Sequence, residues 1–378
     1  MRLLYLSALP WHSFEQRPHK FVRWFQNRFH ASVTWVEPYP SRWPRWSDFV
    51  DRQRSNQREL QLTALPEWLD LIRVPSLPIE PAPLLNFVHY KMWQRFVCRE
   101  KLRCRSTPTT LVVGKPSELA LVCLEELRVV SSVYDAMDDF PAFHSGGAEH
   151  AMRGREMQIA KTVNAVMASS SALVSKFALL SRQVRHVGNA YDGQEMARPA
   201  LQNLRLQHVA KSWERPSVFG YVGTIASWFD WRWVVELANS LPNAEIRLIG
   251  PIHCPVPALP ANVRLCPPCT HFEALSSMAQ FDVGLIPFLK NRLTDSVDPI
   301  KYHEYRALGL PVVSTSFGEM PMYAEKDSGL LLLNLVKESV SLDLTKIDLL
   351  LSHNNENHSI QRTDWTCRFN EVSELFEP

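Results

Sequence analysis

Three aspartates gather in one short stretch of the chain, Val133-Tyr-Asp135-Ala-Met-Asp138-Asp139-Phe140. The apolar and β-branched residues just before them predict a buried strand, so the carboxylates lie where that strand ends. Carboxylates this close together raise the pKa of at least one of them, which suits a residue that removes a proton from a substrate hydroxyl. The alternative is that they cap the turn or helix that follows.

A second group of charged residues lies in Asp298-Pro-Ile-Lys301-Tyr302-His-Glu304-Tyr-Arg-Ala-Leu-Gly309-Leu-Pro311. The pattern predicts a helix over 300–308 that ends at a C-terminal glycine, before a buried strand. Lys301 lies in the first turn, where its ammonium adds to the N-terminal dipole and can meet a diphosphate. Glu304 lies on the same face, where its carboxylate can accept hydrogens from ribose hydroxyls. The alternative is a solvated Lys–Glu pair on an exposed helix.

A glycine turn follows another expected strand in Phe219-Gly-Tyr-Val-Gly223-Thr224-Ile. A glycine at the end of a strand lets the backbone approach a phosphate closely, and the N-terminus of the next helix favours an anion. A glycine kept only for packing would give the same pattern.

Composition narrows the class of protein. The chain has 378 residues, of which 46% are hydrophobic and 21% charged, as in a folded globular protein. Its net charge is 41 − 39 = +2, too small to indicate a nucleic-acid partner. No apolar run is long enough for a transmembrane helix. The apolar start, residues 1–10, is too short for a signal peptide and predicts the first buried strand, so we expect a cytoplasmic protein.

Seven cysteines at irregular spacing suggest reduced thiols. Cys266-Pro-Pro-Cys269, with His271 after it and His253-Cys254 before it, could be taken for a zinc site. Structural zinc needs two tight ligand pairs, whereas these pairs are loose and separated by prolines. We therefore expect incidental loop cysteines and no bound metal.

Short apolar strands alternate with longer amphipathic stretches in both halves of the chain, which predicts parallel sheets covered by helices. We expect an α/β protein with two Rossmann-like, doubly wound domains facing a central cleft. The first spans 1–195 and the second 216–360, and the polar stretch 196–215 is the expected linker. A terminal helix within 361–378 is expected to pack back towards the first domain.

The segment around Lys301 resembles the donor-site helix of bacterial GT-B glycosyltransferases, similar to families 1 and 4, with their pattern P-x-K-x-x-E-Y-x-A-x-G-x-P-V-V-S/T. Phe281-Asp-Val-Gly-Leu-Ile-Pro-Phe288 is similar to a strand of the family, and Gly220–Asp230 is similar to the opening of its donor domain. The resemblance implies a nucleotide diphosphate-sugar as donor substrate, no bound cofactor, and a set of donor-binding residues: Gly223, Thr224, Lys301, Tyr302 and Glu304.

The first half resembles the same family more loosely. Phe14-Glu-Gln-Arg17-Pro-His19 matches members that read Q-R-P-H after the first strand, which implies that Arg17 and His19 lie on the acceptor side. The aspartate stretch is similar to the Tyr-x-Ala-x-Asp segment of the bacterial glucuronosyltransferases of xanthan assembly, whose aspartate is the proposed base. This similarity favours Asp138 as the catalytic base, with Asp135 as the alternative and capping roles as the remaining possibility.

One departure bears on the mechanism. Retaining members of the related family carry a second glutamate eight residues before the position of Glu304, and here that position is Ser296. The arginine and lysine that usually follow the glycine turn are also missing, so Lys301 has more of the phosphate charge to balance. We therefore favour inversion, without a metal, because Lys301 and the helix N-terminus can neutralise the leaving group.

The expected activity is transfer of a sugar, of the hexosyl type, to a glycan or lipid-linked glycan in surface polysaccharide synthesis. The alternatives are a nucleotide-sugar epimerase of the same fold and a noncatalytic nucleotide-binding subunit of a transferase complex. Two stretches, 18–29 and 87–105, are cationic and amphipathic, which is typical of helices that lie on an anionic membrane. Ordinary surface helices would have the same pattern, so peripheral contact with the inner face of the membrane is a hypothesis.

Overall fold

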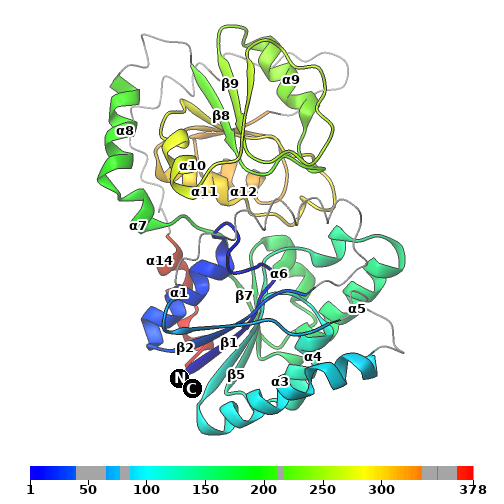
Figure 1. Ribbon diagram of the computed structural model, residues 1–378. Helices are drawn as coiled ribbons and strands as arrows, with labels where there is room; N and C mark the ends of the chain where they lie inside the picture. Colours follow the sequence, from blue (N-terminus) through cyan, green and yellow to red (C-terminus); the bar gives the residue numbers. More distant parts are fainter. Residues whose placement is uncertain (40–64, 77–85, 211–216, 334–346, 348–363, 378) are drawn as a thin grey trace. The chain divides into compact units, whose positions relative to one another are not determined.

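The computed structural model describes residues 1–39, 65–76, 86–210, 217–333, 347 and 364–377 (Figure 1). The chain forms two compact units. Unit 1 comprises residues 1–187 and 369–378, and unit 2 comprises residues 188–368. Each unit is built on one parallel β-sheet, which confirms the predicted α/β class with two doubly wound sheets.

The sheet of unit 1 has the strand order β3-β2-β1-β4-β5-β6-β7. Every pairing in it is parallel. The order reverses between β1 and β4, which is the switch point of a doubly wound sheet. The strands are β1 (Arg2–Leu6), β2 (Ser32–Val36), β3 (Leu69–Ile72), β4 (Thr109–Val113), β5 (Ser131–Ala136), β6 (Ala165–Ala168) and β7 (Val184–His186).

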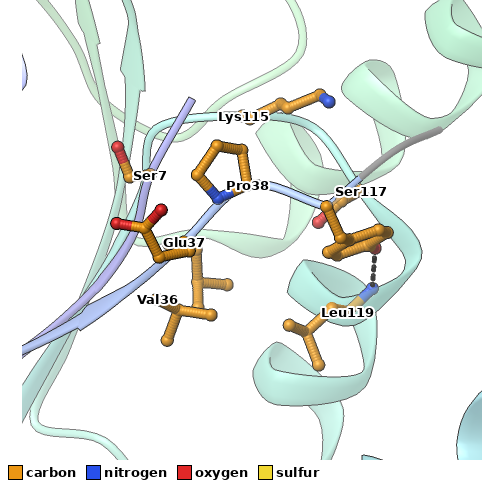
Figure 2. Close-up of a pocket in the computed structure, with 9 residues that line it drawn as sticks. Ser7, Val36, Glu37, Pro38, Lys115, Ser117 and Leu119 are labelled. Carbon is orange, nitrogen blue, oxygen red and sulfur yellow. Dashed lines mark hydrogen bonds between the residues drawn. The ribbon is translucent and has the colours of Figure 1, made fainter. Parts of the chain in front are cut away.

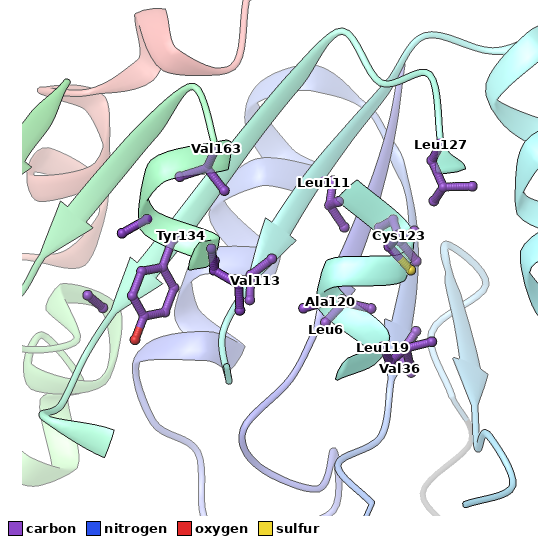
Figure 3. Packing of buried hydrophobic residues seen from close by; sticks show 14 of the residues in the cluster. Leu6, Val36, Leu111, Val113, Leu119, Ala120, Cys123, Leu127, Tyr134 and Val163 are labelled. Atoms are coloured by element: carbon purple, nitrogen blue, oxygen red, sulfur yellow. The ribbon is translucent and has the colours of Figure 1, made fainter. Parts of the chain in front are cut away.

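The helices of unit 1 follow its strands. They are α1 (Arg17–Phe29), α3 (Asn86–Ser106), α4 (Glu118–Glu126), the 3₁₀ helix η1 (Phe140–Phe143), α5 (Gly146–Thr162) and α6 (Ser171–Phe177). Side chains of β1, β4 and β5 pack against α4 and α5 in one apolar core, part of which is drawn in Figure 3. Local sequence defines the helix starts: Ser117, for example, caps α4 by accepting a hydrogen bond from the Ala120 amide.

The end of the chain packs on α1. Helix α14 (Trp365–Asn370) is followed by the 3₁₀ helix η4 (Ser373–Leu375). The rings of Phe369 and Phe376 each lie 5.3 Å, centroid to centroid, from the ring of Phe21. The Trp24 indole also donates a hydrogen bond of 2.9 Å to Asn370 Oδ1. These aromatic contacts explain why the last residues belong to unit 1 although they follow unit 2 in sequence.

The sheet of unit 2 has the order β10-β9-β8-β11-β12-β13, again with parallel pairings. Residues of β8 alternate between two cores: Val218 and Val222 pack with α10 and α11, whereas Phe219 and Tyr221 pack with α9. Both faces of this sheet are therefore covered. The strands are β8 (Val218–Val222), β9 (Glu245–Ile249), β10 (Val263–Cys266), β11 (Val283–Ile286), β12 (Val312–Ser314) and β13 (Leu330–Leu332).

One helix of unit 2, α8 (Pro199–Ala210), lies in the stretch 196–215 where sequence suggests a linker, and α7 (Gly193–Met196) ends at the first residue of that stretch. Residues 211–215 of the expected linker lie outside the described part of the chain. Leu201 of α8 is fully buried against the unit 2 core, a contact that the weak apolar period of this stretch does not reveal. The other helices are α9 (Trp231–Ser240), α10 (His271–Met278), α11 (Ile300–Ala307) and α12 (Met320–Ala324).

Candidate active site

Asp135, near the end of β5, is fully buried and is held by two partners. The Arg17 Nε lies 2.8 Å from Asp135 Oδ1. The Tyr5 hydroxyl donates a hydrogen bond of 3.2 Å to Asp135 Oδ2. Arg17 is itself buried at the start of α1, and its Nη1 also donates to the Val187 carbonyl at 2.6 Å. The Arg17–Asp135 pair thus joins the carboxyl ends of β5 and β7 to α1, and the charge of Asp135 is neutralised.

His19 lies in the first turn of α1 and is buried. Its Nδ1 accepts a hydrogen bond of 3.2 Å from the Gln16 amide, so the ring proton is on Nε2, which lies 3.1 Å from the Trp11 carbonyl oxygen. Burial lowers the pKa of His19 below its usual value. The neutral ring therefore shapes the loop between β1 and α1, the segment that sequence places on the acceptor side.

Asp139 is also neutralised, by a lysine of α6. Lys176 Nζ lies 2.6 Å from Asp139 Oδ1 and 2.5 Å from Glu156 Oε2. The Tyr134 hydroxyl completes this cluster with a hydrogen bond of 2.8 Å to Glu156. Asp139 precedes η1 but its side chain makes no capping hydrogen bond to that helix, so the ion pair with Lys176 is its main contact.

Asp138 differs from both neighbouring aspartates. Like Asp139 it keeps part of its surface exposed, but no lysine or arginine of the described residues lies within ion-pair distance of its carboxylate. Burial raises the pKa of Asp138 to about 7, with Arg17 opposing the shift and the charges of Asp135 and Asp139 adding to it. A carboxyl with this pKa exchanges a proton readily near neutral pH, which is the property that a general base requires.

The turn after β8 is held by a close approach of two backbones. A Cβ atom added at Gly250 would lie 2.1 Å from the Gly223 carbonyl oxygen, so only glycine fits there. The Gly223 amide donates to the Ile249 carbonyl at 2.9 Å and is therefore occupied. The Thr224 amide and hydroxyl make no hydrogen bond with the described residues. These two groups are therefore the hydrogen-bond donors of the turn that a ligand could use.

Lys301 and Glu304 lie one turn apart on α11, as the sequence predicts. Lys301 Nζ is 2.5 Å from Glu304 Oε2, and the side chains are only 18% and 7% exposed. This pair is therefore not the solvated surface pair of the alternative interpretation. Gly309 adopts a φ of +74°, the left-handed conformation expected of the glycine after the helix.

Tyr302 points into the protein. Its hydroxyl donates a hydrogen bond of 2.9 Å to Asp327, and its ring stacks on Tyr323 with centroids 4.4 Å apart. Arg306 also pairs with Asp327, at 2.7 Å. These contacts fix the orientation of α11, so the Tyr302 ring supports the helix that carries Lys301.

Asp298 is a buried residue whose role the sequence does not reveal. Its carboxylate accepts hydrogen bonds from the Asn189 amide at 2.5 Å and from the Tyr323 hydroxyl at 3.0 Å, and His303 Nε2 lies 3.0 Å away. Burial alone would raise its pKa, but His303 and these donors outweigh burial and lower the pKa below its usual value. Asp298 thus anchors the start of α11 to the segment after β7. The sequence signal that could have pointed to this role is the position of Asp298 directly before Pro299, where α11 begins.

Helix α3 of unit 1 carries an exposed face that is both cationic and apolar. The side chains of Phe87 and Leu102 are 65% and 64% exposed. Lys91, Arg95 and Arg99 are exposed on the same helix, whereas its one acidic residue, Glu100, is buried against Arg2. In the described part of the chain, no helix is long and apolar enough to cross a membrane.

All seven cysteines carry free thiols, Cys266 and Cys269 included. Thr270, next to Cys269, begins α10 with a capping box that Glu273 completes. Within the described ranges, no three His, Cys, Asp or Glu side chains are arranged to hold a metal ion.

Comparison with known proteins agrees with the fold. No protein-family model and no curated protein sequence matches the chain. Among solved structures, HepE from Anabaena in complex with UDP has a TM-score of 0.61 at 14% identity, over 100% of this chain and 99% of that chain. Sucrose-phosphate synthase from Thermosynechococcus elongatus has a TM-score of 0.65 at 13% identity, over 100% of this chain and 98% of that chain. The UDP-GlcNAc 2-epimerase from Neisseria meningitidis, bound to UDP-GlcNAc, has a TM-score of 0.53 at 13% identity, over 100% of this chain and 99% of that chain.

The chain therefore has the GT-B fold along its whole length, and this confirms the predicted fold class. Identities of this size establish the architecture alone. Because glycosyltransferases and an epimerase share this architecture, the activity has to be argued from the residues.

Proposed function

We propose that this chain transfers a sugar from a nucleotide diphosphate-sugar to a hydroxyl of a glycan or lipid-linked glycan acceptor. The observation that carries the proposal is the asymmetry of the three aspartates at the end of β5 and just after it. Asp135 and Asp139 are each held by a cation, whereas Asp138 has no ion-pair partner among the described residues and its pKa is raised to about 7. An inverting transferase needs one such carboxylate to take the proton of the acceptor hydroxyl.

In the proposed reaction, Asp138 takes that proton as the acceptor oxygen forms a bond to the anomeric carbon of the donor. The bond from this carbon to the diphosphate breaks, and its electron pair leaves with the nucleoside diphosphate. A single displacement of this kind inverts the anomeric configuration. Ser296, buried where retaining relatives have a glutamate, supports this outcome because it provides no second carboxylate.

The donor half of the reaction is assigned to unit 2. Lys301, in the first turn of α11, holds the diphosphate together with the donors of the Gly223–Thr224 turn, and Glu304 holds the ribose. Donor binding then replaces the Lys301–Glu304 pair with contacts to phosphate and ribose. Lys301 and the helix N-terminus balance the leaving-group charge, so we propose a metal-independent hexosyltransferase.

The acceptor half is assigned to unit 1. Arg17 and His19 define the loop after β1, and this loop and Asp138 lie at the same edge of the sheet. The exposed face of α3 fits an anionic membrane, because its cations can meet lipid phosphates while Phe87 and Leu102 enter the interface. Such contact suits a lipid-linked acceptor in surface polysaccharide synthesis at the inner face of the membrane.

Thermal-shift measurements against UDP, ADP, GDP, dTDP and their sugar conjugates test the donor side, because a ligand that binds only the folded chain raises its stability. The stabilising sugar conjugate is then incubated with and without a glycolipid extract. Transfer that requires the extract supports the proposal. Epimerised donor formed without acceptor favours the epimerase alternative, and binding without turnover in any extract favours a noncatalytic subunit.

A further inference from the structure

The short loop that carries Asp138 is held on both sides of that residue by the segment after β6. Ser169 directly follows β6, and its hydroxyl donates a hydrogen bond of 2.9 Å to the Met137 carbonyl. On the other side, the carboxylate of Asp139 pairs with Lys176 of α6 at 2.6 Å. One segment therefore fixes the residues directly before and directly after Asp138.

Ser169 lies in a turn that is itself fixed. The residue is fully buried, and its amide donates a hydrogen bond of 3.1 Å to the Ala136 carbonyl at the end of β5. The next residue, Ser170, caps α6 by accepting a hydrogen bond of 3.4 Å from the Leu173 amide. The Ser169 hydroxyl therefore meets the loop from a defined position.

The position of Lys176 is set by buried groups behind the loop. Its ammonium lies 2.5 Å from Glu156 of α5, a fully buried carboxylate that also accepts a hydrogen bond of 2.8 Å from the Tyr134 hydroxyl. The same ammonium lies 5.1 Å from the centre of the Phe177 ring. Lys176 thus connects Asp139, on the loop, to a strand and two helices of unit 1.

The charges around Asp138 are balanced in pairs. The charged groups of the described chain that act on Asp138 are Arg17 of α1, Asp135 of β5 and Asp139 of its own loop. Arg17 pairs with Asp135 at 2.8 Å, and Lys176 pairs with Asp139. Without the charge of Lys176, Asp139 would be an uncompensated negative charge beside Asp138, and this disfavours the carboxylate form of Asp138.

Glu156 does not change this expectation. Burial raises its pKa above the usual value, and the charge of Lys176 opposes that shift. When the lysine charge is lost, Glu156 is therefore expected to take a proton and become neutral. Asp139 is partly exposed and keeps its charge, so the change that Asp138 experiences comes from Asp139.

We infer that Ser169 and Lys176 are positioning residues for the proposed base. Ser169 fixes the backbone before Asp138, and Lys176 holds Asp139 and balances its charge, so that Asp138 stays ionised near neutral pH. This inference rests on the proposed function, because it takes Asp138 as the base.

Titration of Asp138 in the full chain tests the role of Lys176 without any substrate. In protein labelled with ¹³C at the aspartate side-chain carboxyl, the Asp138 signal is the one that Asp138→Asn lacks. Lys176→Gln keeps a hydrogen-bond donor for Glu156 but loses the charge, and is expected to raise the titration midpoint of Asp138 by roughly one pH unit. Lys176→Arg, which keeps the charge, and Lys161→Gln, at an exposed site of α5, leave the midpoint unchanged.

Removal of the Asp139 charge tests the same coupling from the other partner. Asp139→Asn leaves Lys176 on Glu156 and is expected to lower the Asp138 midpoint by roughly one pH unit. Combined with Lys176→Gln, it returns the midpoint to about the wild-type value. Because Asp139 is partly exposed, this variant reports the coupling even where Lys176→Gln does not fold.

Ser169→Ala tests the hydrogen bond on the other side of Asp138. Loss of this bond to the Met137 carbonyl is expected to lower kcat roughly fivefold, with the Asp138 midpoint and the donor affinity unchanged. Ser175→Ala, an exposed change on α6, is the matched control and keeps the wild-type kcat.

A cooperative thermal unfolding transition identifies the folded variants. A midpoint that stays unchanged in folded Lys176→Gln or Asp139→Asn overturns the role of Lys176, and wild-type kcat in Ser169→Ala overturns the role of Ser169. The pH profile of sugar transfer separates this inference from the proposed function. If the midpoint moves but the profile of kcat/KM does not follow it, Asp138 is not the base, and the proposed function is contradicted instead.

Discussion

The carboxyl edges of the two sheets carry different chemistry although both sheets are parallel and doubly wound. In unit 1 the edge after β5 holds three carboxylates within five residues, and cations neutralise Asp135 and Asp139 but leave Asp138 with a raised pKa. In unit 2 the edge after β8 is a backbone turn at Gly223, and the candidate cation is Lys301 in the first turn of α11.

This difference shows how one architecture can divide the work of a transfer reaction. A proton acceptor needs a carboxylate that is kept from ion pairing, which unit 1 achieves by giving its cations to the two neighbouring aspartates. An anion site needs backbone donors, a helix N-terminus and a cation, and unit 2 has these at the Thr224 turn and in the first turn of α11. The proposed function gives proton transfer to unit 1 and donor binding to unit 2, and the five predictions below test parts of that proposal.

The largest effect is expected for Asp138→Asn, which keeps the shape of the side chain but cannot take a proton. We expect kcat to fall by about 10²–10⁴-fold with donor affinity unchanged, as for loss of a general base. Radiolabelled sugar transfer measures kcat, and calorimetry measures donor affinity. Asp70→Asn, in a surface pair with Arg103, is the control and should leave both unchanged. If Asp138→Asn transfers sugar at the wild-type rate, Asp138 of unit 1 is not the catalytic base.

A smaller and complementary effect is expected for Lys301→Met in unit 2. Loss of a charged hydrogen bond to phosphate should weaken donor binding by roughly 10–100-fold. The affinity is measured by calorimetry with the nucleotide that stabilises the wild type. Lys326→Met, an exposed change in the same unit, controls for net charge. If Lys301→Met lowers kcat alone, the two units do not divide the reaction as proposed.

Charge reversal on α3 tests whether unit 1 also provides the membrane contact. Each cation near an anionic surface contributes about 1 kcal/mol, so Lys91→Glu with Arg95→Glu should lower binding to phosphatidylglycerol vesicles by at least about tenfold. Vesicle flotation measures the bound fraction, with phosphatidylcholine vesicles as the neutral reference. Arg153→Glu with Lys161→Glu makes the same charge change on α5. Equal losses from both pairs would indicate net charge and not the α3 face.

The pH dependence of the reaction should follow the ionisation of Asp138. Because its pKa is raised to about 7, the carboxylate is the major form only above that pH, and kcat/KM should fall about tenfold between pH 8 and pH 6. The profile is measured at saturating donor so that acceptor kinetics are reported. A profile that is flat over this range would mean that the base has an ordinary aspartate pKa.

The smallest expected effect is on stability: Asp138→Asn is expected to be more stable than the wild type, although it is less active. The folded-state pKa of Asp138 lies above the unfolded value, so the wild type loses stability as pH rises from about 4 through about 7. Asp138→Asn avoids this cost and should be more stable at pH 8 by about 1 kcal/mol or more. Urea unfolding at pH 8 and pH 4 measures the difference, which should vanish at the lower pH.

Much of the fold could be predicted because it depends on local pattern. The alternation of apolar and amphipathic stretches indicated a parallel sheet in each half of the chain, and the glycine at Gly309 marked the end of α11. Helix α8 was missed because its apolar period is weak and its burial depends on distant residues such as Met278 and Phe281. The small hollow lined by Leu6, Glu37 and Lys115 (Figure 2) was not predicted for a similar reason, since its wall comes from segments far apart in sequence.

By itself the sequence determined the two-sheet architecture and the types of residue that could take part in transfer. Periodicity and turn residues act over a few positions, so they can be interpreted without tertiary contacts. Only the tertiary structure decided which carboxylate is neutralised, because Arg17 lies 118 positions from Asp135 and Lys176 lies 37 from Asp139. The pKa of a carboxyl depends on burial and on charges within a few ångströms, and these are brought together only when the sheet forms.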